Sequence, residues 1–462
     1  MTWLWPLPPL SLKKLRNQYK IVNMRLNRLC MISGLLMTGF IANSQKMLTL
    51  EEAVATALKN NFDIQVSKND SLVATLDYGY RYGAFVPQLN ATAGAVWNNN
   101  NQRQTLADGT KREQGGLRSH NVAASLNLNW TLFDGLKMFA TIDKAGEYVK
   151  LGSLTIKNQV TNTVAAVVSN YYNIAAQKQQ LKAIREQMSV SEERVKLAQN
   201  RLDIGVGAKP DVLQSKVDLN AQRANILTQE TLITQLKEQL NQAMNVAPNT
   251  PYEVEDSIPI NHDLTLGDIQ QDIEHTNPLL QVAKKNIDIS TLTLKERKAE
   301  LLPVLSFNSA YNFSRTNNTT VINNFSLLFN QNHGFNYGLS LTAPILNNFN
   351  SRRLVKQAQL DISYQQLLYD RERSLLQLRV NNAYTAFTQQ QKALTLEEDN
   401  ILLAKENVSI ILQTLRLGAA TIIQLREAQQ SLENAYNRLI TARYNTKLAE
   451  TELRRLKGDL VQ

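Results

Sequence analysis

The sequence predicts a membrane protein of the α+β class. Long antiparallel α-helical coiled coils would form a helical barrel, and four β-strands per chain would contribute to a trimeric, twelve-stranded transmembrane β-barrel. Three observations predict this fold. The chain repeats itself once, its hydrophobic period changes between 3.6 and 2 within each copy, and its helical stretches are too long for a compact domain.

The first 44 residues differ in kind from the rest of the chain. They contain six Lys and Arg residues between Lys13 and Arg28 and no acid, followed by the apolar run Leu29 to Ile41. This pattern predicts a secretory signal at residues 1–44, cleaved after Ser44, with Met24 as a possible true start. A retained anchor is the alternative, although the run is shorter than the roughly 20 residues that span a bilayer.

Charge and side-chain chemistry argue against several functions. Removing the six basic residues of the signal lowers the formal net charge from +10 to +4, so the balance gives no support for nucleic-acid binding. The single cysteine, Cys30, lies in the signal and leaves the mature chain without thiol chemistry. The four His residues show no ligand-like spacing, and no Gly-rich phosphate loop follows a strand. We therefore expect no enzyme, no cofactor and no metal site.

An internal twofold repeat organises the mature chain. Leu48-Thr49-Leu50 returns as Leu264-Thr265-Leu266 at a separation of 216, and Gly205 returns as Gly418 at a separation of 213. Prolines concentrate between the two copies, which is typical of a junction. The predicted units are residues 45–245 for the first repeat, 246–263 for the junction and 264–462 for the second repeat.

Alternating apolar and polar residues predict two strands in each repeat. From Leu89 to Trp97, for example, apolar residues alternate with Asn, Thr and Gly. Each run has about the 9–11 residues of a tilted membrane strand. A soluble, half-buried sheet would alternate in the same way, but the long polar segments 98–121 and 316–334 are typical of extracellular loops. The predicted strands are residues 88–98, 121–133, 303–315 and 335–346.

Long helices are predicted on either side of the strands. No proline occurs between Pro210 and Pro248 or after Pro344. A continuous helix from Asp134 to Asp203 would be about 105 Å long at ~1.5 Å per residue. Apolar residues seven apart predict a coiled coil, for which an ordinary soluble coiled coil is the alternative. These positions are Val212, Leu219, Ile226, Ile233 and Leu240 in the first repeat and Leu425, Leu432 and Leu439 in the second.

Membrane strands constrain the number of copies. Four strands leave two open edges, whose N–H and C=O groups would be unpaired in hydrocarbon, so other copies of the chain must close the sheet. Two copies would give a side-chain-filled barrel, whereas three would give an aqueous lumen. We therefore expect a homotrimer, in which polar faces line the pore. The apolar faces, with Trp97, Trp130, Tyr311 and Tyr337, would meet outer-membrane lipid.

The mature chain resembles the TolC family of outer-membrane efflux proteins over essentially its whole length. The resemblance rests on the leading motif Leu48 to Ala53, on Leu132 to Gly135 at the end of a strand, and on the Gly205 and Gly418 turns. It implies the exit duct of a tripartite efflux or type I secretion system, with its helical part in the periplasm. The implied partners are a periplasmic adaptor (membrane fusion protein) and an inner-membrane pump of the RND or ABC type.

The resemblance also implies two sets of site residues. Glycine at a hairpin tip has a physical reason, because reversing a helix commonly needs a positive φ. Beyond each tip, three copies of Glu427 would form an acidic ring that favours cations, although Asp211 and Glu427 could merely complement a helix start. Ala420 and Leu415 replace the Arg and Tyr of a closing lock in some members. The implied adaptor-docking residues are Ile204, Gly205, Val206, Leu417, Gly418 and Ala419, and the implied periplasmic aperture residues are Asp211, Gln424 and Glu427.

Two other classes of exported helical protein are alternatives to a channel. A periplasmic adaptor would show one hairpin flanked by separate β domains, whereas this chain repeats a strand pair and a hairpin. A periplasmic or surface coiled-coil protein without channel activity is the remaining alternative. Ion conductance would separate it from a channel.

Overall fold

The computed structural model describes residues 46–323 and 325–460. The predicted signal at residues 1–44 lies outside the described residues. The chain divides into two units. The small unit includes the described residues Lys46, Met47 and Pro251–Glu253. A two-stranded sheet is formed by β1 (Lys46–Leu48) and β4 (Tyr252–Val254). All other described residues belong to the large unit.

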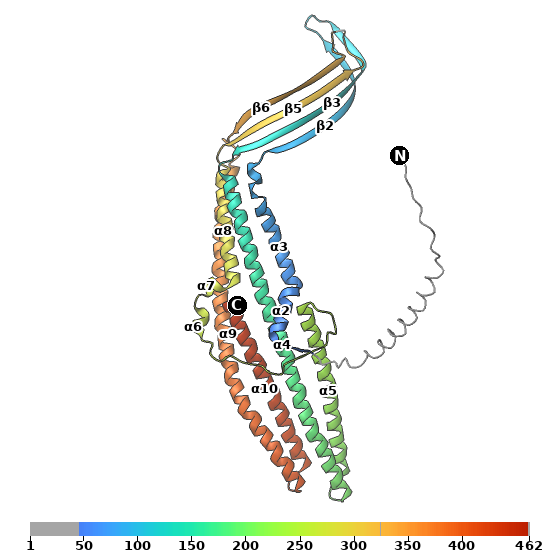
Figure 1. The fold of residues 1–462 in the computed structure, drawn as a ribbon, viewed down its shortest axis with the longest axis vertical. Coiled ribbons are helices and arrows are strands. Elements are labelled where there is room, and N and C mark those ends of the chain that lie inside the picture. The colour runs from blue at the N-terminus through green and yellow to red at the C-terminus, as the bar shows by residue number, and fades with distance from the viewer. Residues whose placement is uncertain (1–45, 324, 461–462) are drawn as a thin grey trace, which may run out of the picture. The chain divides into compact units, whose positions relative to one another are not determined.

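The large unit contains a four-stranded antiparallel sheet in the order β2-β3-β5-β6 (Figure 1). Its edges are β2 and β6, and its hydrogen-bonded neighbours follow the chain as two hairpins joined between β3 and β5. This arrangement confirms the prediction of two strands per repeat. The strands are β2 (Gln88–Thr105), β3 (Lys111–Phe133), β5 (Val304–Asn318) and β6 (Phe329–Thr342).

The strands are longer at one end than the alternation predicts. The sequence predicts a loop over residues 98–121, whereas β2 and β3 stay paired as far as Thr105 and Lys111. Arg103 and Glu113 face each other across this extension with an Nη2 to Oε2 distance of 2.7 Å. The prediction is wrong here because a ribbon exposed to water on both faces pairs polar with polar residues, and hydrophobic alternation cannot mark it.

The strand register separates an apolar face from a polar face. On the apolar face, Tyr311 of β5 lies between Leu126 of β3 and Phe335 of β6. On the polar face, Asn129 of β3 lies opposite Asn308 of β5. A slip of one residue would exchange the two faces, so the pattern fixes the register.

The two repeats form helical hairpins of matching length. Helices α4 (Lys137–Asp203) and α9 (Asn350–Arg416) each contain 67 residues, and α5 (Lys209–Met244) and α10 (Ile422–Lys457) each contain 36. None of the helices that the structure describes has the length and apolar character needed to cross a bilayer. The remaining helices are α2 (Leu50–Asn60), α3 (Phe62–Gly79), η1 (Arg81–Phe85), α6 (Leu266–Gln270), α7 (Ile273–Thr276) and α8 (Pro278–Ala299).

The long helices lie side by side in a single layer (Figure 1). Helix α4 packs against α5 on one side and α10 on the other, and α10 packs against α9. The helical wall of the large unit therefore has the order α5-α4-α10-α9, with α5 and α9 as its edges. Helices α3 and α8 pack against α4, and α8 also packs against α9.

The predicted heptad positions form the apolar cores of the hairpins. Leu425, Leu432 and Leu439 of α10 are buried together with the alanines three residues after each, and they pack against apolar residues of α9. In α5 four of the five predicted positions are buried, and Ile226 is half-buried. Each fully buried Leu or Val side chain stabilises the fold by about 1.5–3 kcal/mol. The coiled-coil prediction is therefore confirmed.

Both repeats turn from strand to helix through two consecutive residues with positive φ. These are Gly135 and Leu136, with φ of +75° and +70°, and Asn348 and Phe349, with φ of +55° and +59°. A Cβ at Gly135 would lie 2.4 Å from the carbonyl oxygen of Ala299, so only glycine fits there. The two corners fix the direction in which each hairpin leaves the sheet.

Candidate functional site at the hairpin tips

The α4–α5 hairpin turns at Ile204-Gly205-Val206, where the glycine pattern predicts a tip. The N–H of Gly205 donates to the carbonyl of Leu202 at 3.0 Å, and the N–H of Val206 donates to the carbonyl of Arg201 at 2.9 Å. These are the two hydrogen bonds of a Schellman motif, which closes a helix C-terminus. Gly205 has a φ of +78°, a conformation that glycine adopts without strain.

The α9–α10 hairpin repeats this turn at Leu417-Gly418-Ala419. The N–H of Gly418 donates to Leu415 at 3.1 Å, and the N–H of Ala419 donates to Thr414 at 2.9 Å. Gly418 also has a φ of +78°. The two tips therefore end their long helices in the same way.

The helices that follow the tips begin differently. Helix α5 starts after Ala208, which provides no side-chain cap, and has Pro210 in its first turn. Helix α10 starts with a capping box, in which the N–H of Gln424 donates to Thr421 Oγ1 at 3.2 Å and the N–H of Thr421 donates to Gln424 Oε1 at 2.8 Å. The side chain of Gln424 thus satisfies its own helix start.

Gly207 lies within the predicted tip region, near residues 204–207, but it is not among the predicted docking residues. A Cβ at this position would lie 2.7 Å from the backbone nitrogen of Leu202 and 2.8 Å from the carbonyl carbon of Arg201. The corresponding residue of the second tip is Ala420, whose carbonyl accepts a hydrogen bond from Arg201 Nη1 at 3.5 Å. The sequence signal for this close approach is a second glycine two residues after Gly205.

The tips hold apolar side chains out to solvent. Exposed fractions are 74% for Ile204, 65% for Val206, 84% for Leu417 and 61% for Ile423. Single exposed apolar residues are ordinary, but a group of them at the ends of two adjacent hairpins marks a contact surface. The Arg201 contact to Ala420 places the two tips next to each other.

The predicted aperture residues occupy three different environments. Asp211 lies half-buried in the first turn of α5, and Gln424 belongs to the capping box. Glu427 is exposed and lines a cavity of about 480 Å³ between α4, α5 and α10. Asp211 does not line this cavity. Within one chain, the structure therefore does not bring the three residues together.

A buried arginine dominates that cavity. Arg194 of α4 is 1% exposed, and its Nη2 donates to Asp218 Oδ2 of α5 at 2.7 Å. Burial lowers the pKa of Arg194, and the neighbouring Asp218 carboxylate opposes this shift. Its Nε has no hydrogen-bond partner within the described part of the chain. The sequence alone does not indicate a buried role for Arg194, because an arginine in a long helix usually lies on a solvated face.

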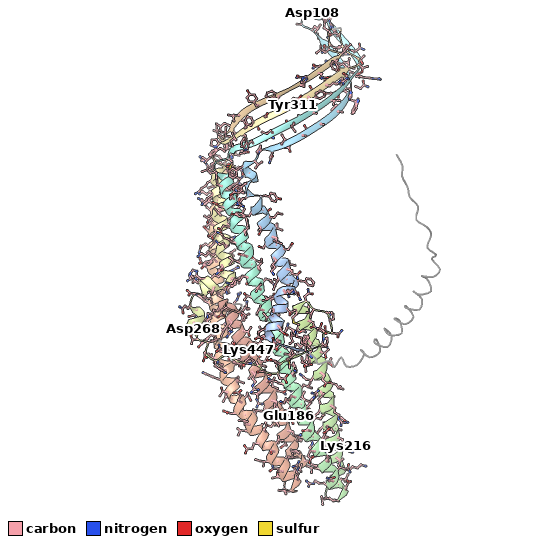
Figure 2. All side chains as sticks on the ribbon, in the orientation of Figure 1. Asp108, Glu186, Lys216, Asp268, Tyr311 and Lys447 are labelled. Atoms are coloured by element: carbon pink, nitrogen blue, oxygen red, sulfur yellow. The ribbon has the colours of Figure 1, made fainter. Side chains whose placement is uncertain are left out.

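The two hairpins meet through polar contacts, which we call the hairpin seam and define by the facing residues of α4, α9 and α10. Gln429 Nε2 donates to Ser191 Oγ at 3.3 Å, and Arg416 pairs with Glu193 at 3.3 Å. The Tyr436 hydroxyl donates to Glu186, whose position on α4 is labelled in Figure 2. Burial, followed by this hydrogen bond, raises the pKa of Tyr436. The seam is not wholly polar, because Val190 and Leu197 of α4 also pack against the apolar core of the α9–α10 hairpin.

No group of three potential metal ligands occurs among residues 46–323 and 325–460. The site therefore consists of two closed turns, an exposed apolar surface and the hairpin seam, which suit contact with a partner and control of an opening. A sheet with one apolar and one polar face, joined to helical hairpins of this length, fits the subunit of a membrane β-barrel channel.

Comparisons with known proteins agree with this class. The family model described as outer membrane efflux protein matches residues 53–246 and 269–459. The chain belongs to this family, whose members form trimeric channels that work with efflux pumps. The two matched segments fall in the two repeats.

Individual relatives share the architecture at low sequence identity. The outer membrane efflux protein BepC of Brucella suis is 20% identical over 442 residues, which cover 93% of this chain and 88% of BepC. The outer membrane protein TolC of Escherichia coli is 21% identical over 437 residues, covering 92% and 85%. The solved CmeC outer membrane channel of Campylobacter jejuni is similar with a TM-score of 0.75 and 15% identity, covering 89% of this chain and 85% of CmeC.

The family match confirms the function and the localisation that the resemblance implies. The chain is an outer-membrane efflux channel of the kind that serves tripartite efflux and type I secretion systems. It is a transport protein rather than an enzyme, and its helical part lies in the periplasm.

Proposed function

We propose that three copies of this chain close into one duct, with twelve strands in the membrane and a continuous tunnel of helices below them. The sheet supports this proposal because β2 and β6 are both free edges among the residues that the structure describes. Their N–H and C=O groups need partners in hydrocarbon, and pairing β2 of one copy with β6 of the next provides them. Repeating that contact around a threefold axis closes the ring.

The helical wall has free edges of the same kind. On α9, Leu403 and Ile410 are 65% and 51% exposed, and on α5, Val217 and Leu227 are 61% and 67% exposed. Apolar residues on two opposite edges of a wall are expected when a neighbouring copy covers each edge. The same rotation that joins β6 to β2 would bring α9 of one copy to α5 of the next.

We further propose that the tips dock onto a periplasmic adaptor, through which the duct works with an inner-membrane pump of the RND or ABC type. The observation that carries this proposal is the open space around the tip glycines. A Cβ at Gly205 or Gly418 would meet no atom within 4 Å, although apolar side chains surround both positions. A partner helix can therefore approach the bare backbone and bury those side chains.

Asp211 and Glu427 are proposed as the charged residues of the periplasmic aperture. Both lie within the first two turns of the helices that follow the tips, and Glu427 makes no ion pair with any residue that the structure describes. Three copies of each would surround a common axis. Gln424 would contribute to the aperture only through the helix start that it caps.

The docking proposal is tested by replacing each tip glycine with Asn and, separately, with Val. Asn adopts positive φ more readily than Val, so Gly205→Asn and Gly418→Asn preserve the turn while placing a side chain in the docking space. We expect both kinds of variant to assemble normally and to lose adaptor contact and export. Cysteine cross-linking of Val206→Cys to the adaptor measures the contact, and drug susceptibility of cells measures export.

Gly109→Asn is the matched control, because Gly109 has a φ of +84° and equally open space but lies in the β2–β3 turn. It should leave export intact. Full export with Asn at both tips would show that the glycines serve the turn alone and would remove the support for docking. A stable single subunit in detergent, without conductance in a planar bilayer, would contradict the duct itself.

A further inference from the structure

The apolar face of the sheet carries a groove. Small side chains, Ala91 and Ala93 of β2 and Ala124 of β3, lie beside the larger Tyr311 and Phe313 of β5. The resulting hollow has a volume of about 310 Å³ and is lined almost wholly by apolar atoms. Tyr311, labelled in Figure 2, marks its place in the middle of the sheet. The groove extends across β2, β3 and β5 and can hold part of one hydrocarbon chain.

A basic side chain, that of Arg315, lies beyond the end of the groove nearest the β2–β3 turn. In the next row of the sheet toward that turn, Val122 lies opposite Arg315 of β5. The guanidinium of Arg315 lies over the ring of Phe329, 5.4 Å from its centroid. One row further, the rings of Trp97 and His120 stack with centroids 4.8 Å apart. Aromatic rings on a sheet surface beside a cation are typical of a membrane boundary.

The position of Arg315 fits the outer boundary of the bilayer. Arg315 is ten residues from Leu305, near the opposite end of β5. At ~3.4 Å per residue and a tilt of about 40°, this separation spans about 26 Å, close to the ~25 Å height of the apolar band of membrane barrels. Leu305 would therefore lie near the periplasmic boundary and Arg315 near the external one.

Basic residues outnumber acidic residues in the four strands. The four strands contain five Lys and Arg residues and one acid, Glu113, which is paired with Arg103. Arg118 and Arg315 have no acidic partner within the described residues, and alternation along the register places both on the apolar face. Arg118 lies two rows beyond Arg315 on the neighbouring strand. Two unpaired guanidinium groups above an apolar groove complement a phosphate above an acyl chain.

We propose that this groove binds an anionic lipid, whose acyl chain lies along the alanines and whose phosphate contacts Arg315 and Arg118. The inference rests on the proposed function, because closure of the barrel turns the apolar face toward the bilayer. The long arginine side chains can reach the boundary while their methylene groups stay in the apolar layer. A neutral lipid would occupy the groove without the phosphate contacts, and free phosphate would lack the groove.

The experiment measures lipid binding to the purified trimer by native mass spectrometry. Phosphatidylglycerol is the probe, diacylglycerol with the same acyl chains tests the groove alone, and glycerol 3-phosphate tests the phosphate site alone. We expect clear binding of phosphatidylglycerol only. Because each basic residue near an anionic membrane contributes about 1 kcal/mol, the double variant Arg118→Gln/Arg315→Gln should bind about 30-fold more weakly.

Two matched controls separate the groove from general effects. Lys111→Gln removes a charge at the last residue pair of β2 and β3, next to their turn, and should leave lipid binding unchanged. Ala93→Phe fills the groove and should weaken binding, whereas Ala123→Phe, adjacent to Ala124 but on the polar face, should not. Trimer mass and conductance should persist in Ala93→Phe and in the double arginine variant, so that lost lipid binding is distinguishable from a failed channel.

Three outcomes would overturn the proposal. Equal binding of diacylglycerol would mean an unspecific lipid surface. Equal binding of glycerol 3-phosphate would mean an ion site without a lipid. Undiminished binding of phosphatidylglycerol to the double variant would show that the two arginines play no part.

Discussion

The buried ion pair next to the hairpin seam offers a quantitative test of how the helical wall is held. In Arg194→Met an apolar side chain replaces the guanidinium, and Asp218 of α5 loses its ion-pair partner while it keeps the hydrogen bond from Gln214. The side chain of Arg194 is 2% exposed and that of Asp218 is 25% exposed. The substitution therefore leaves a carboxylate that is only partly hydrated against an apolar methionine.

The expected cost follows from that partial exposure. Removing one partner of a fully buried pair costs about 3–5 kcal/mol, because the remaining charge is uncompensated. Water reaches Asp218, so we discount this figure to about 2 kcal/mol for Arg194→Met. In the double variant Arg194→Met/Asp218→Leu no charge remains unpaired, and the pair of substitutions should be nearly neutral. The coupling energy of the cycle should then be about 2 kcal/mol.

Hydrogen–deuterium exchange of the assembled protein is the appropriate assay, since it reports local opening without requiring the barrel to unfold. Amides of α4 around Arg194 should exchange about 30-fold faster in the single variant, the factor that 2 kcal/mol implies, and should recover in the double variant. The exposed pair of Arg185 and Glu230, with side chains 57% and 45% exposed, is the control. Removing Arg185 should change exchange by about fivefold at most.

Two results would refute the reasoning. Unchanged exchange in Arg194→Met would show that water solvates Asp218 fully once the arginine is gone. If the amides of the double variant exchange as fast as those of the single variant, packing of the arginine, rather than pairing of its charge, stabilises this part of the wall.

Two further predictions concern charge in the helical part. Burial, followed by the Glu450 carboxylate, raises the pKa of Tyr172 to about 12, above the ~10 of an unfolded tyrosine. The neutral phenol therefore contributes about 2–3 kcal/mol to the free energy of unfolding, in full below pH 10, and this contribution is lost as the pH rises through 12. The midpoint of thermal unfolding should fall over that pH window in the wild type and fall less in Tyr172→Phe. At the proposed aperture, a cation about 10 Å from each of three carboxylates gains about 1 kcal/mol in water. Glu427→Gln should therefore lower the cation preference about fivefold, seen as a reversal potential closer to zero in a salt gradient, whereas Gln424→Ala should not alter it.

Features encoded by local periodicity could be predicted from the sequence. The apolar positions seven apart are buried because a helix presents them on one stripe wherever it packs. The tip glycines were predictable because a C-terminal turn with positive φ favours glycine at one position, and the repeat presents that position twice. The polar and apolar faces of the strands follow from alternation in the same way.

Features that depend on distant partners could not be predicted. Arg194 lies in a polar stretch of α4, and only the approach of α5 and α10 buries it. Leu136 and Phe349 adopt positive φ although their side chains disfavour it, because the strand before and the helix after each corner are both fixed by packing. The extension of β2 and β3 is a continued backbone ladder between polar residues, with Arg103 opposite Glu113, and no hydrophobic pattern marks it.

The two repeats share their helix lengths and tip turns, yet their tips are chemically different. After the first tip, there is no room for a side chain at Gly207, and the following helix begins at Lys209 without a side-chain cap. After the second, Ala420 occupies the corresponding place and Thr421 caps the helix. In the proposed trimer the six tips would therefore alternate between two surfaces, so an adaptor that contacts all six must recognise two kinds of site. A glycine substitution at one tip should consequently weaken docking to a different extent from the same substitution at the other.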